Sequence, residues 1–213
     1  MVAPRRYGPA MLRALAEVAF PAVCPGCGGR GEPLCAACAP TVRPAPALAP
    51  PAGLDGLVVP FAYSGVVREL VARAKYRRRH AAVAWLAGAM VSALVEHATD
   101  VDVVTWAPTT DARRRHRGFD QAEMLARAVG STRRLPVRSL LRRAGEGHQT
   151  GRSRAERIHA PTFLARSTTT VAARRVLVVD DVVTTGATLA AAAAALRGAG
   201  AATVVGVAAA RRP

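Results

Sequence analysis

A short apolar run that ends in two acidic residues constrains the fold more than any other part of the sequence. Residues 176–179 are Val-Leu-Val-Val, a composition typical of a strand that is buried on both faces of a parallel sheet. Asp180 and Asp181 follow directly, and the alanine-rich segment 189–196 has a high helix propensity. Ligands of parallel sheets bind at the carboxyl ends of the strands. We therefore expect the two carboxylates at the mouth of a binding site.

The loop between this strand and this helix is rich in hydroxyl groups. It contains Thr184, Thr185, Gly186 and Thr188. A loop of this kind at a helix N-terminus offers free backbone N–H groups, hydroxyl donors and the positive end of the helix dipole, which together suit a phosphate, while carboxylates one loop away suit a sugar diol. In a purely structural alternative the acids cap the helix and the threonines turn the chain, but that role needs neither two adjacent acids nor three threonines.

This stretch resembles the phosphoribosyl pyrophosphate (PRPP) signature of type I phosphoribosyltransferases, in which an apolar strand is followed by Asp-Asp and then Thr-Thr-Gly-x-Thr. The resemblance implies that the two carboxylates hold the ribose hydroxyls and that the loop surrounds the 5′-phosphate. It also implies Mg²⁺, bound together with PRPP. The PRPP-binding residues implied in this way are Asp180, Asp181, Val182, Thr184, Thr185, Gly186, Ala187 and Thr188.

The charge of the chain permits a nucleic-acid partner without indicating one. The formal net charge is +16, but Lys75 is the only lysine among 30 basic residues, a bias that a GC-rich coding sequence would produce by itself. The longest uncharged apolar stretch, residues 81–95, is shorter than the ~20 residues of a membrane span. Arg13 and Glu17 interrupt the apolar residues of segment 10–20, which fits a helix better than a signal peptide. We expect a soluble, cytoplasmic protein without a membrane span.

All four cysteines lie near the N-terminus in two Cys-x-x-Cys pairs, Cys24 with Cys27 and Cys35 with Cys38. Paired motifs of this kind are typical of a Cys₄ zinc site. Two disulfides are the alternative, but nothing else in the sequence indicates an oxidising compartment. Four thiolate ligands leave no open coordination position, so the expected zinc is structural. We predict an N-terminal helix, zinc module and proline-rich linker in residues 1–50, and one further domain in residues 51–213.

A second polar segment follows the strand expected at residues 101–106. It runs from Ala107-Pro-Thr-Thr through an arginine-rich stretch, 113–117, to Gln121, where a helix from about 120 to 129 begins. A solvated basic face is the alternative for the arginines. However, a stretch just past the carboxyl end of a strand lies on the ligand side of the sheet, where guanidinium groups suit diphosphate oxygens.

Residues 117–121, Arg-Gly-Phe-Asp-Gln, resemble the Arg-Gly-Phe-Asn-Gln element of the ComF (competence protein F) family. The resemblance extends to Tyr63-Ser-Gly with Lys75-Tyr76, to the spacing of Gln149, Ser153 and Arg157, and to the cysteine pairs, so it covers nearly the whole chain. The sequence departs from the family in having Asp120 in place of asparagine and Trp106-Ala-Pro in place of Pro-Val-Pro. An aspartate there would weaken anion binding unless a neighbouring arginine neutralises it.

The resemblance implies further site residues. Asp180, Asp181, Arg113 and Arg117 would be catalytic, and the pyrophosphate and substrate loops would contain Ala107, Pro108, Thr109, Lys75, Gln121, Gln149 and Arg157. The polar segment 142–161, with three glycines, is expected to be a lid over the site.

The expected fold is an α/β domain with a mostly parallel sheet of the type I phosphoribosyltransferase kind and a small N-terminal zinc-binding module. Further strands are expected at 54–62, 137–141 and 203–208, and helices at 66–76 and 81–97. The resemblance implies displacement at ribose C1 of Mg²⁺-bound PRPP by an unidentified acceptor, with a role in DNA uptake. The alternative is a non-catalytic PRPP-sensing adaptor that binds single-stranded DNA or competence proteins. An aromatic content of 4% argues against a platform for base stacking, and the oligomeric state stays open.

Overall fold

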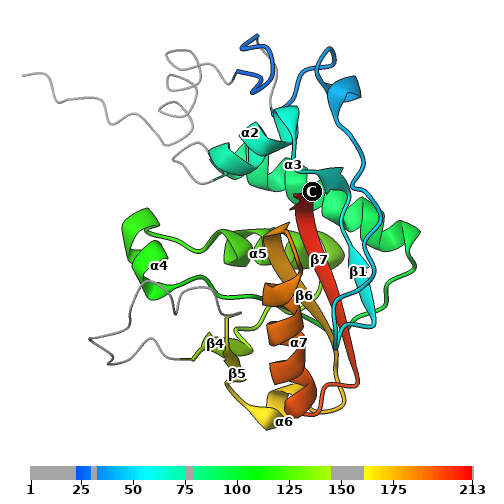
Figure 1. Ribbon diagram of the computed structural model, residues 1–213, viewed down its shortest axis with the longest axis vertical. Coiled ribbons are helices and arrows are strands. Elements are labelled where there is room, and N and C mark those ends of the chain that lie inside the picture. The colour runs from blue at the N-terminus through cyan, green and yellow to red at the C-terminus, as the bar shows by residue number, and fades with distance from the viewer. Residues whose placement is uncertain (1–22, 30–32, 75–78, 145–160, 213) are drawn as a thin grey trace, which may run out of the picture.

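The structure is a computed structural model, and it describes residues 23–29, 33–74, 79–144 and 161–212 (Figure 1). The segment expected to form the first helix, residues 10–20, lies outside these ranges. So do Lys75, Gln149, Arg157 and most of the expected lid. Within the described ranges, every helix is too short or too polar to cross a bilayer.

A parallel sheet forms the centre of the molecule, as predicted. The strand order is β1 (Gly56–Val58), β7 (Thr203–Arg211), β6 (Arg175–Val183) and β3 (Val103–Trp106), and β2 (Phe61–Ala62) also pairs with β7. The apolar run 176–179 lies in β6, where all four side chains are fully buried. It contacts β3 on one side and β7 on the other, which explains why its composition lacks polar alternation.

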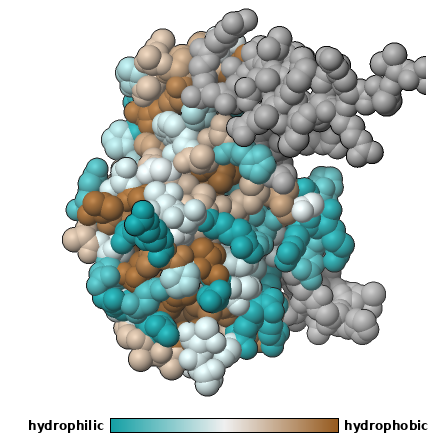
Figure 2. Space-filling model, turned by 180° about the vertical axis from the view of Figure 1, so that it is seen from behind, coloured by the Kyte–Doolittle hydropathy of each residue, from teal (hydrophilic) through white to brown (hydrophobic). Residues whose placement is uncertain are grey.

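Helices cover both faces of this sheet (Figure 1). On one face lie α2 (Gly65–Arg73), α3 (Arg79–Glu96) and α5 (Gln121–Arg133), and on the other α7 (Ala187–Gly198) with the short α6 (Thr168–Val171). Successive β6 side chains point to opposite faces, so Leu177 and Val179 pack against the first group and Val176 and Val178 against the second. Figure 2 shows the molecule from behind, where patches of hydrophobic surface lie among hydrophilic residues.

Two of the expected strands differ from the structure. The strand expected at 54–62 is divided into β1 and β2, which pair with β7 in the same register and are separated by Val59 and Pro60. The strand expected at 137–141 is wrong: only one bridge, between Val104 and Val137, joins this segment to the central sheet. The Leu140 N–H donates to the Arg138 carbonyl at 3.0 Å and to the Thr105 hydroxyl at 3.3 Å, and not to a backbone carbonyl of β3.

The chain then enters a separate two-stranded sheet. In it β4 (Leu141–Arg143) pairs antiparallel with β5 (Phe163–Ala165). These two strands border the segment expected to be a lid, so both ends of that segment are fixed to the same small sheet.

The arginine-rich stretch forms a short helix that the sequence did not predict, α4 (Asp111–Arg117). The Thr110 hydroxyl caps its N-terminus by accepting a bond from the Arg113 N–H at 3.2 Å. Gly118, with a φ of 75°, ends it in a left-handed conformation.

The proline-rich segment lies against the domain. After the short 3₁₀ helix η1 (Ala39–Thr41), the Arg43 carbonyl accepts from the Ala62 N–H at 3.0 Å, and the Ala45 N–H donates to the Pro60 carbonyl at 3.1 Å. The segment therefore continues the sheet beside β2 over a few residues.

Candidate functional site

The candidate site begins where β6 extends beyond its neighbour. The last residue of β3, Trp106, is opposite Val179, so residues 180–183 pair only with β7 and are open on the other side. A cavity of about 190 Å³ lies beside them. The residues that line it are Ala107, Pro108, Thr109, Arg113, Arg117, Asp120, Gln121, Ala122, Arg143, Asp180, Asp181, Val182 and Thr188. The structure thus brings together ten of the predicted site residues, from the loop after β3, α4, α5, β6 and α7.

The sequence predicted the two adjacent carboxylates just after the strand. They lie within β6 instead, because the strand continues to Val183. Both are half-buried rather than freely exposed. Burial and then the negative charge of Asp181 raise the pKa of Asp180 well above its usual value, with a smaller contribution from Asp120. A cavity lined by three carboxyl groups favours a ligand that brings hydroxyl donors or a cation.

The threonine-rich loop forms a second cavity, of about 240 Å³, between Pro161 and the N-terminus of α7. Gly186 is the N-cap residue of α7 with a φ of 81° and has no side chain to cap the helix, while the Ala187 N–H donates to the Thr185 hydroxyl at 3.3 Å. The next N–H groups of α7, those of Thr188 and Leu189, have no side-chain partner among the described residues, as expected of a phosphate-binding loop. This cavity shares Asp180, Val182 and Thr188 with the first, so the two adjoin.

Asp120 connects the loop after β3 to the start of α5. Its Oδ2 accepts from the Thr109 N–H at 2.8 Å, and its Oδ1 accepts from the Ala122 and Glu123 N–H groups at 3.0 and 3.4 Å. The side chain is only 4% exposed, and burial raises its pKa. Asp120, which stands where the ComF element has asparagine, therefore caps α5 and holds the loop after β3. The sequence did not suggest this role.

Three arginines line the first cavity, and the sequence predicted two of them. Arg113 and Arg117 come from α4, where both are exposed. The third, Arg143, comes from β4; its Nη1 lies 3.5 Å from the Pro108 carbonyl oxygen and its guanidinium lies 5.6 Å from the centre of the Phe163 ring. No sequence signal could have found it, because its position depends on the antiparallel pairing of β4 with β5.

Gln121 lies at the wall of the cavity but also has a structural contact. Its Nε2 donates to the Val71 carbonyl of α2 at 3.1 Å, and the side chain is 4% exposed. Its Oε1 is buried and has no partner among the described residues. The predicted substrate residue therefore joins α5 to α2 as well as lining the site.

The four cysteines form a cluster about the N-terminus of the described chain. Their sulfur atoms all lie within 4.8 Å of one another. The Cys27 and Cys35 sulfurs are 3.6 Å apart, far longer than a disulfide and close to the edge of a tetrahedron with Zn–S bonds of about 2.3 Å. The Gly26 and Gly29 N–H groups each point to a cysteine sulfur at 3.4 Å. The cluster is therefore shaped to hold a metal ion such as zinc.

The acidity of the thiols supports this interpretation. Backbone N–H donors, first that of Cys35, lower the pKa of Cys24 to about 6, whereas the side chains of Cys35 and Cys24 raise the pKa of Cys38 to about 12. The Cys38 thiol keeps its proton because it bonds to the sulfurs of Cys35 and Cys24 and because a Cys24 thiolate repels a second negative charge. A cation among the four sulfurs would remove this repulsion and favour the thiolate forms.

One family model matches the C-terminal part of the chain, which supplies part of the lining of the first cavity. Residues 116–213 match the model of the phosphoribosyl transferase domain. This domain has the type I phosphoribosyltransferase fold. The matched residues include β6, the threonine-rich loop and α7, so both carboxylates and this loop lie in the part of the chain that matches the phosphoribosyl transferase domain.

Solved structures give weaker likenesses to the phosphoribosyltransferase domain. One, titled as the allosteric regulatory enzyme of purine biosynthesis, is 24% identical, covers 60% of this chain and 25% of its own, and has a TM-score of 0.42. A glutamine PRPP amidotransferase from B. subtilis is 21% identical over 66% of this chain and 30% of its own, with a TM-score of 0.43. A purine phosphoribosyltransferase from Pyrococcus horikoshii is 19% identical, and the match covers 58% of this chain and 72% of that one. The TM-score is 0.33.

The chain thus spans less than a third of the length of the first two of these structures. No curated protein matches it. The assignment of the fold therefore depends on the family match and on the sheet itself.

Proposed function

We propose that the two adjoining cavities bind PRPP and that the protein transfers the phosphoribosyl group to an acceptor. The observation that carries this proposal is their arrangement. The N-terminus of α7, whose N-cap residue is a glycine, faces one cavity, three arginines line the other, and Asp180 lies in the wall of both. The spacing of anion-binding groups on either side of paired carboxylates suits a sugar with a phosphate at one end and a diphosphate at the other.

Each part of PRPP has a partner in this arrangement. The loop 184–188 would hold the 5′-phosphate through its N–H and hydroxyl groups, and Asp180 and Asp181 would accept bonds from the ribose hydroxyls. Arg113, Arg117 and Arg143 would surround the diphosphate. When bound, Mg²⁺ would be held by diphosphate oxygens with one or two carboxylates and would neutralise the charge that develops on the leaving group.

The reaction follows from these positions. The bond between ribose C1 and the diphosphate oxygen breaks, the acceptor forms the new bond at C1, and the electron pair of the broken bond leaves with the diphosphate. The arginines stabilise that negative charge, which is where most of the rate acceleration in such a site arises.

The test measures Mg²⁺-PRPP binding by calorimetry and diphosphate release with candidate acceptors. We expect the double variant Asp180→Asn, Asp181→Asn to lose binding by at least about a hundredfold, since two charge-assisted contacts disappear. Asp100→Asn, an exposed position at the opposite end of the sheet, is the matched control. Unchanged affinity in the folded double variant would exclude PRPP as the ligand.

A second candidate function is supported by α4. Its residues 113–117 are all basic and exposed, and they adjoin the cavity. Such a surface would attract single-stranded DNA in a PRPP-sensing adaptor of the cytoplasm that takes part in DNA uptake, as the ComF resemblance implies. Binding of single-stranded DNA that depends on PRPP, without diphosphate release for any acceptor, would favour this function over catalysis.

A further inference from the structure

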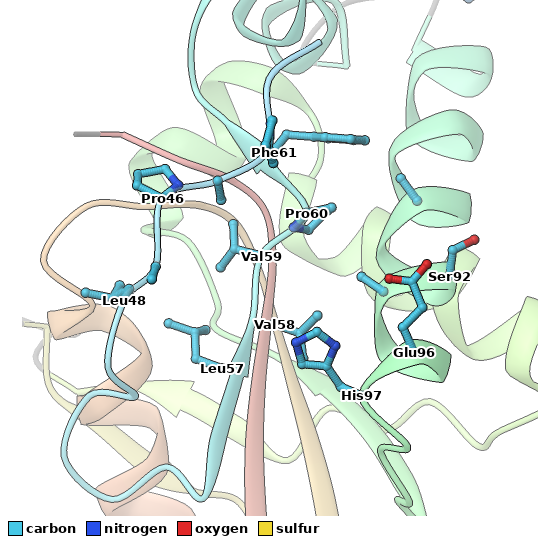
Figure 3. Close-up of a pocket in the computed structure, with 15 residues that line it drawn as sticks. Pro46, Leu48, Leu57, Val58, Val59, Pro60, Phe61, Ser92, Glu96 and His97 are labelled. Carbon is cyan, nitrogen blue, oxygen red and sulfur yellow. The ribbon is translucent and has the colours of Figure 1, made fainter.

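A large groove lies along the outer edge of β1, and none of its residues lines the proposed PRPP site (Figure 3). Its volume is about 720 Å³, within the ~300–1,000 Å³ of typical ligand pockets. Its floor is formed by residues 57–61, one wall by residues 44–48, and the other by the C-terminal part of α3 with Ala89, Ser92, Ala93, Glu96 and His97.

The floor of this groove is a strand edge with available backbone groups. The Tyr63 N–H donates to the Arg211 carbonyl and the Asp55 N–H to the Val204 carbonyl, so odd-numbered residues of this segment face β7. Even-numbered residues face outward, because hydrogen-bonding groups alternate along a parallel strand. Two of these outward-facing residues bond to the segment 43–45: the Ala62 N–H donates to the Arg43 carbonyl, and the Pro60 carbonyl accepts from the Ala45 N–H.

These bonds to the segment 43–45 do not continue to β1. By the same alternation the N–H and C=O groups of Gly56 and Val58 point away from β7. No backbone group in the described part of the chain bonds to them from the groove side. Residues 46–48 have by then diverged from the strand, which leaves the groove between them and β1 (Figure 3).

The two walls are fixed in place and differ in polarity. The Arg211 guanidinium donates to the carbonyl oxygens of Pro46 and Ala47, which holds the first wall on the domain. In Figure 3, Leu48, Leu57 and Val59 face one another on this side. On the α3 side, Val58 and Pro60 lie near Ser92, Glu96 and His97, so this wall is partly polar.

We propose that the groove binds an extended peptide segment of a partner protein, which adds as a strand to the edge of β1. Successive side chains of such a strand point to opposite walls. The wall of prolines and leucines would take apolar side chains. The α3 wall would take lysine or arginine, because Glu96 is the one acidic residue in the groove and has no ion pair among the described residues.

A second copy of this chain is a poor occupant. Its own β1 edge lies between the same two walls, so two recessed edges cannot approach each other closely enough to pair. A protruding strand from another protein has no such obstacle.

The test uses a defined probe, the peptide acetyl-Val-Lys-Val-Lys-Val-Lys-amide with a fluorescent label, and follows its anisotropy. The chain carries a net charge of +16, so non-specific attraction would favour the matching Val-Glu peptide and not the Val-Lys one. We expect saturable binding with a preference for the Val-Lys peptide. Glu96→Gln should weaken binding by about threefold to tenfold, the effect of one partly exposed ion pair.

A bulky side chain should close the groove. Ser92 is exposed on the α3 wall, so Ser92→Trp should fold and weaken binding at least about tenfold, whereas Ala84→Trp, exposed two turns earlier on α3, should not. Hydrogen exchange should slow at the Val58 and Gly56 amides on binding. The Asp180→Asn, Asp181→Asn variant should bind the peptide normally, which separates this proposal from the proposed function.

Three results of the binding experiment would overturn the proposal. They are no saturable binding of the Val-Lys peptide, binding that Ser92→Trp leaves intact, and binding without protection of the Val58 amide. A concentration-dependent dimer that Ser92→Trp dissociates would assign the groove to a second copy and would equally overturn it.

Discussion

The backbone N–H of Thr109 donates to Oδ2 of Asp120 at 2.8 Å, and this one bond ties the loop after β3 to the helix that lines the same cavity. The other carboxylate oxygen caps α5, so a single buried side chain satisfies donors on two segments. An asparagine has only one acceptor oxygen and cannot replace both sets of bonds.

We therefore predict that Asp120→Ala lowers the free energy of unfolding by about 1–2 kcal/mol, the usual effect of losing an N-cap. Asp120→Asn should cost less, because it keeps one acceptor and removes a buried charge. Urea denaturation measures both. In each variant hydrogen exchange at the Thr109 amide should become faster; an unchanged rate would show that the loop is held by other contacts.

The fold was largely predictable from the sequence because its central signal is local. The apolar run 176–179 predicts a strand buried on both faces, and the residues after it predict the loop and α7, all of which the structure contains. The cysteine spacing likewise predicts a cluster, since the ligand positions lie within 15 residues of one another.

The parts that the sequence missed depend on contacts between distant segments. Arg143 reaches the cavity only because β4 pairs with β5, and the Thr109–Asp120 bond joins two loops whose approach no periodicity reveals. The groove beside β1 is another example. It exists because a proline-rich segment, which composition alone describes as a linker, bonds to Pro60 and Ala62 and then diverges.

A second prediction concerns pH. Asp102 accepts from the side chain and backbone N–H of Arg175, and these bonds lower its pKa from 3.8 to about 2. A depressed folded-state pKa gives stability that is present above the unfolded value and lost as pH falls through the folded value. The stability difference between the native protein and Asp102→Asn should therefore shrink between about pH 4 and about pH 2.

Urea denaturation at a series of pH values measures this difference. Glu96→Gln removes an exposed carboxylate that has no ion pair among the described residues and serves as the control. A difference between the native protein and Asp102→Asn that stays constant over this range would contradict the role of Arg175.

The cysteine cluster should hold one zinc ion per chain, which metal analysis of the freshly purified protein measures. We expect Cys35→Ser to lose the metal and to loosen residues 23–29 and 33–38, because the four cysteines that would share the ion join these two segments. The domain with the phosphoribosyltransferase fold should stay folded, and the binding of PRPP proposed for it should not change. A protein without zinc, or with two disulfides in a thiol assay, would contradict this prediction.

The last prediction concerns the turn that begins α7. Gly186 has a φ of 81°, which costs other residues roughly 1–2 kcal/mol, and a Cβ at this position would lie 2.3 Å from Cγ of Pro51. Gly186→Ala should therefore destabilise the protein by more than the backbone strain alone and displace the loop that is proposed to hold the 5′-phosphate. Because Cγ of Pro51 supplies the closest clash, Pro51→Ala combined with Gly186→Ala should recover most of the steric part of the loss, leaving the backbone part and a closer contact with Cβ of residue 51. Gly198→Ala, at the end of the same helix with no neighbouring atom near its added Cβ, is the matched control and should be neutral or slightly stabilising. A double-mutant cycle in urea, with PRPP affinity measured for each variant, separates the two contributions; if the two substitutions act additively, Pro51 does not restrict the turn.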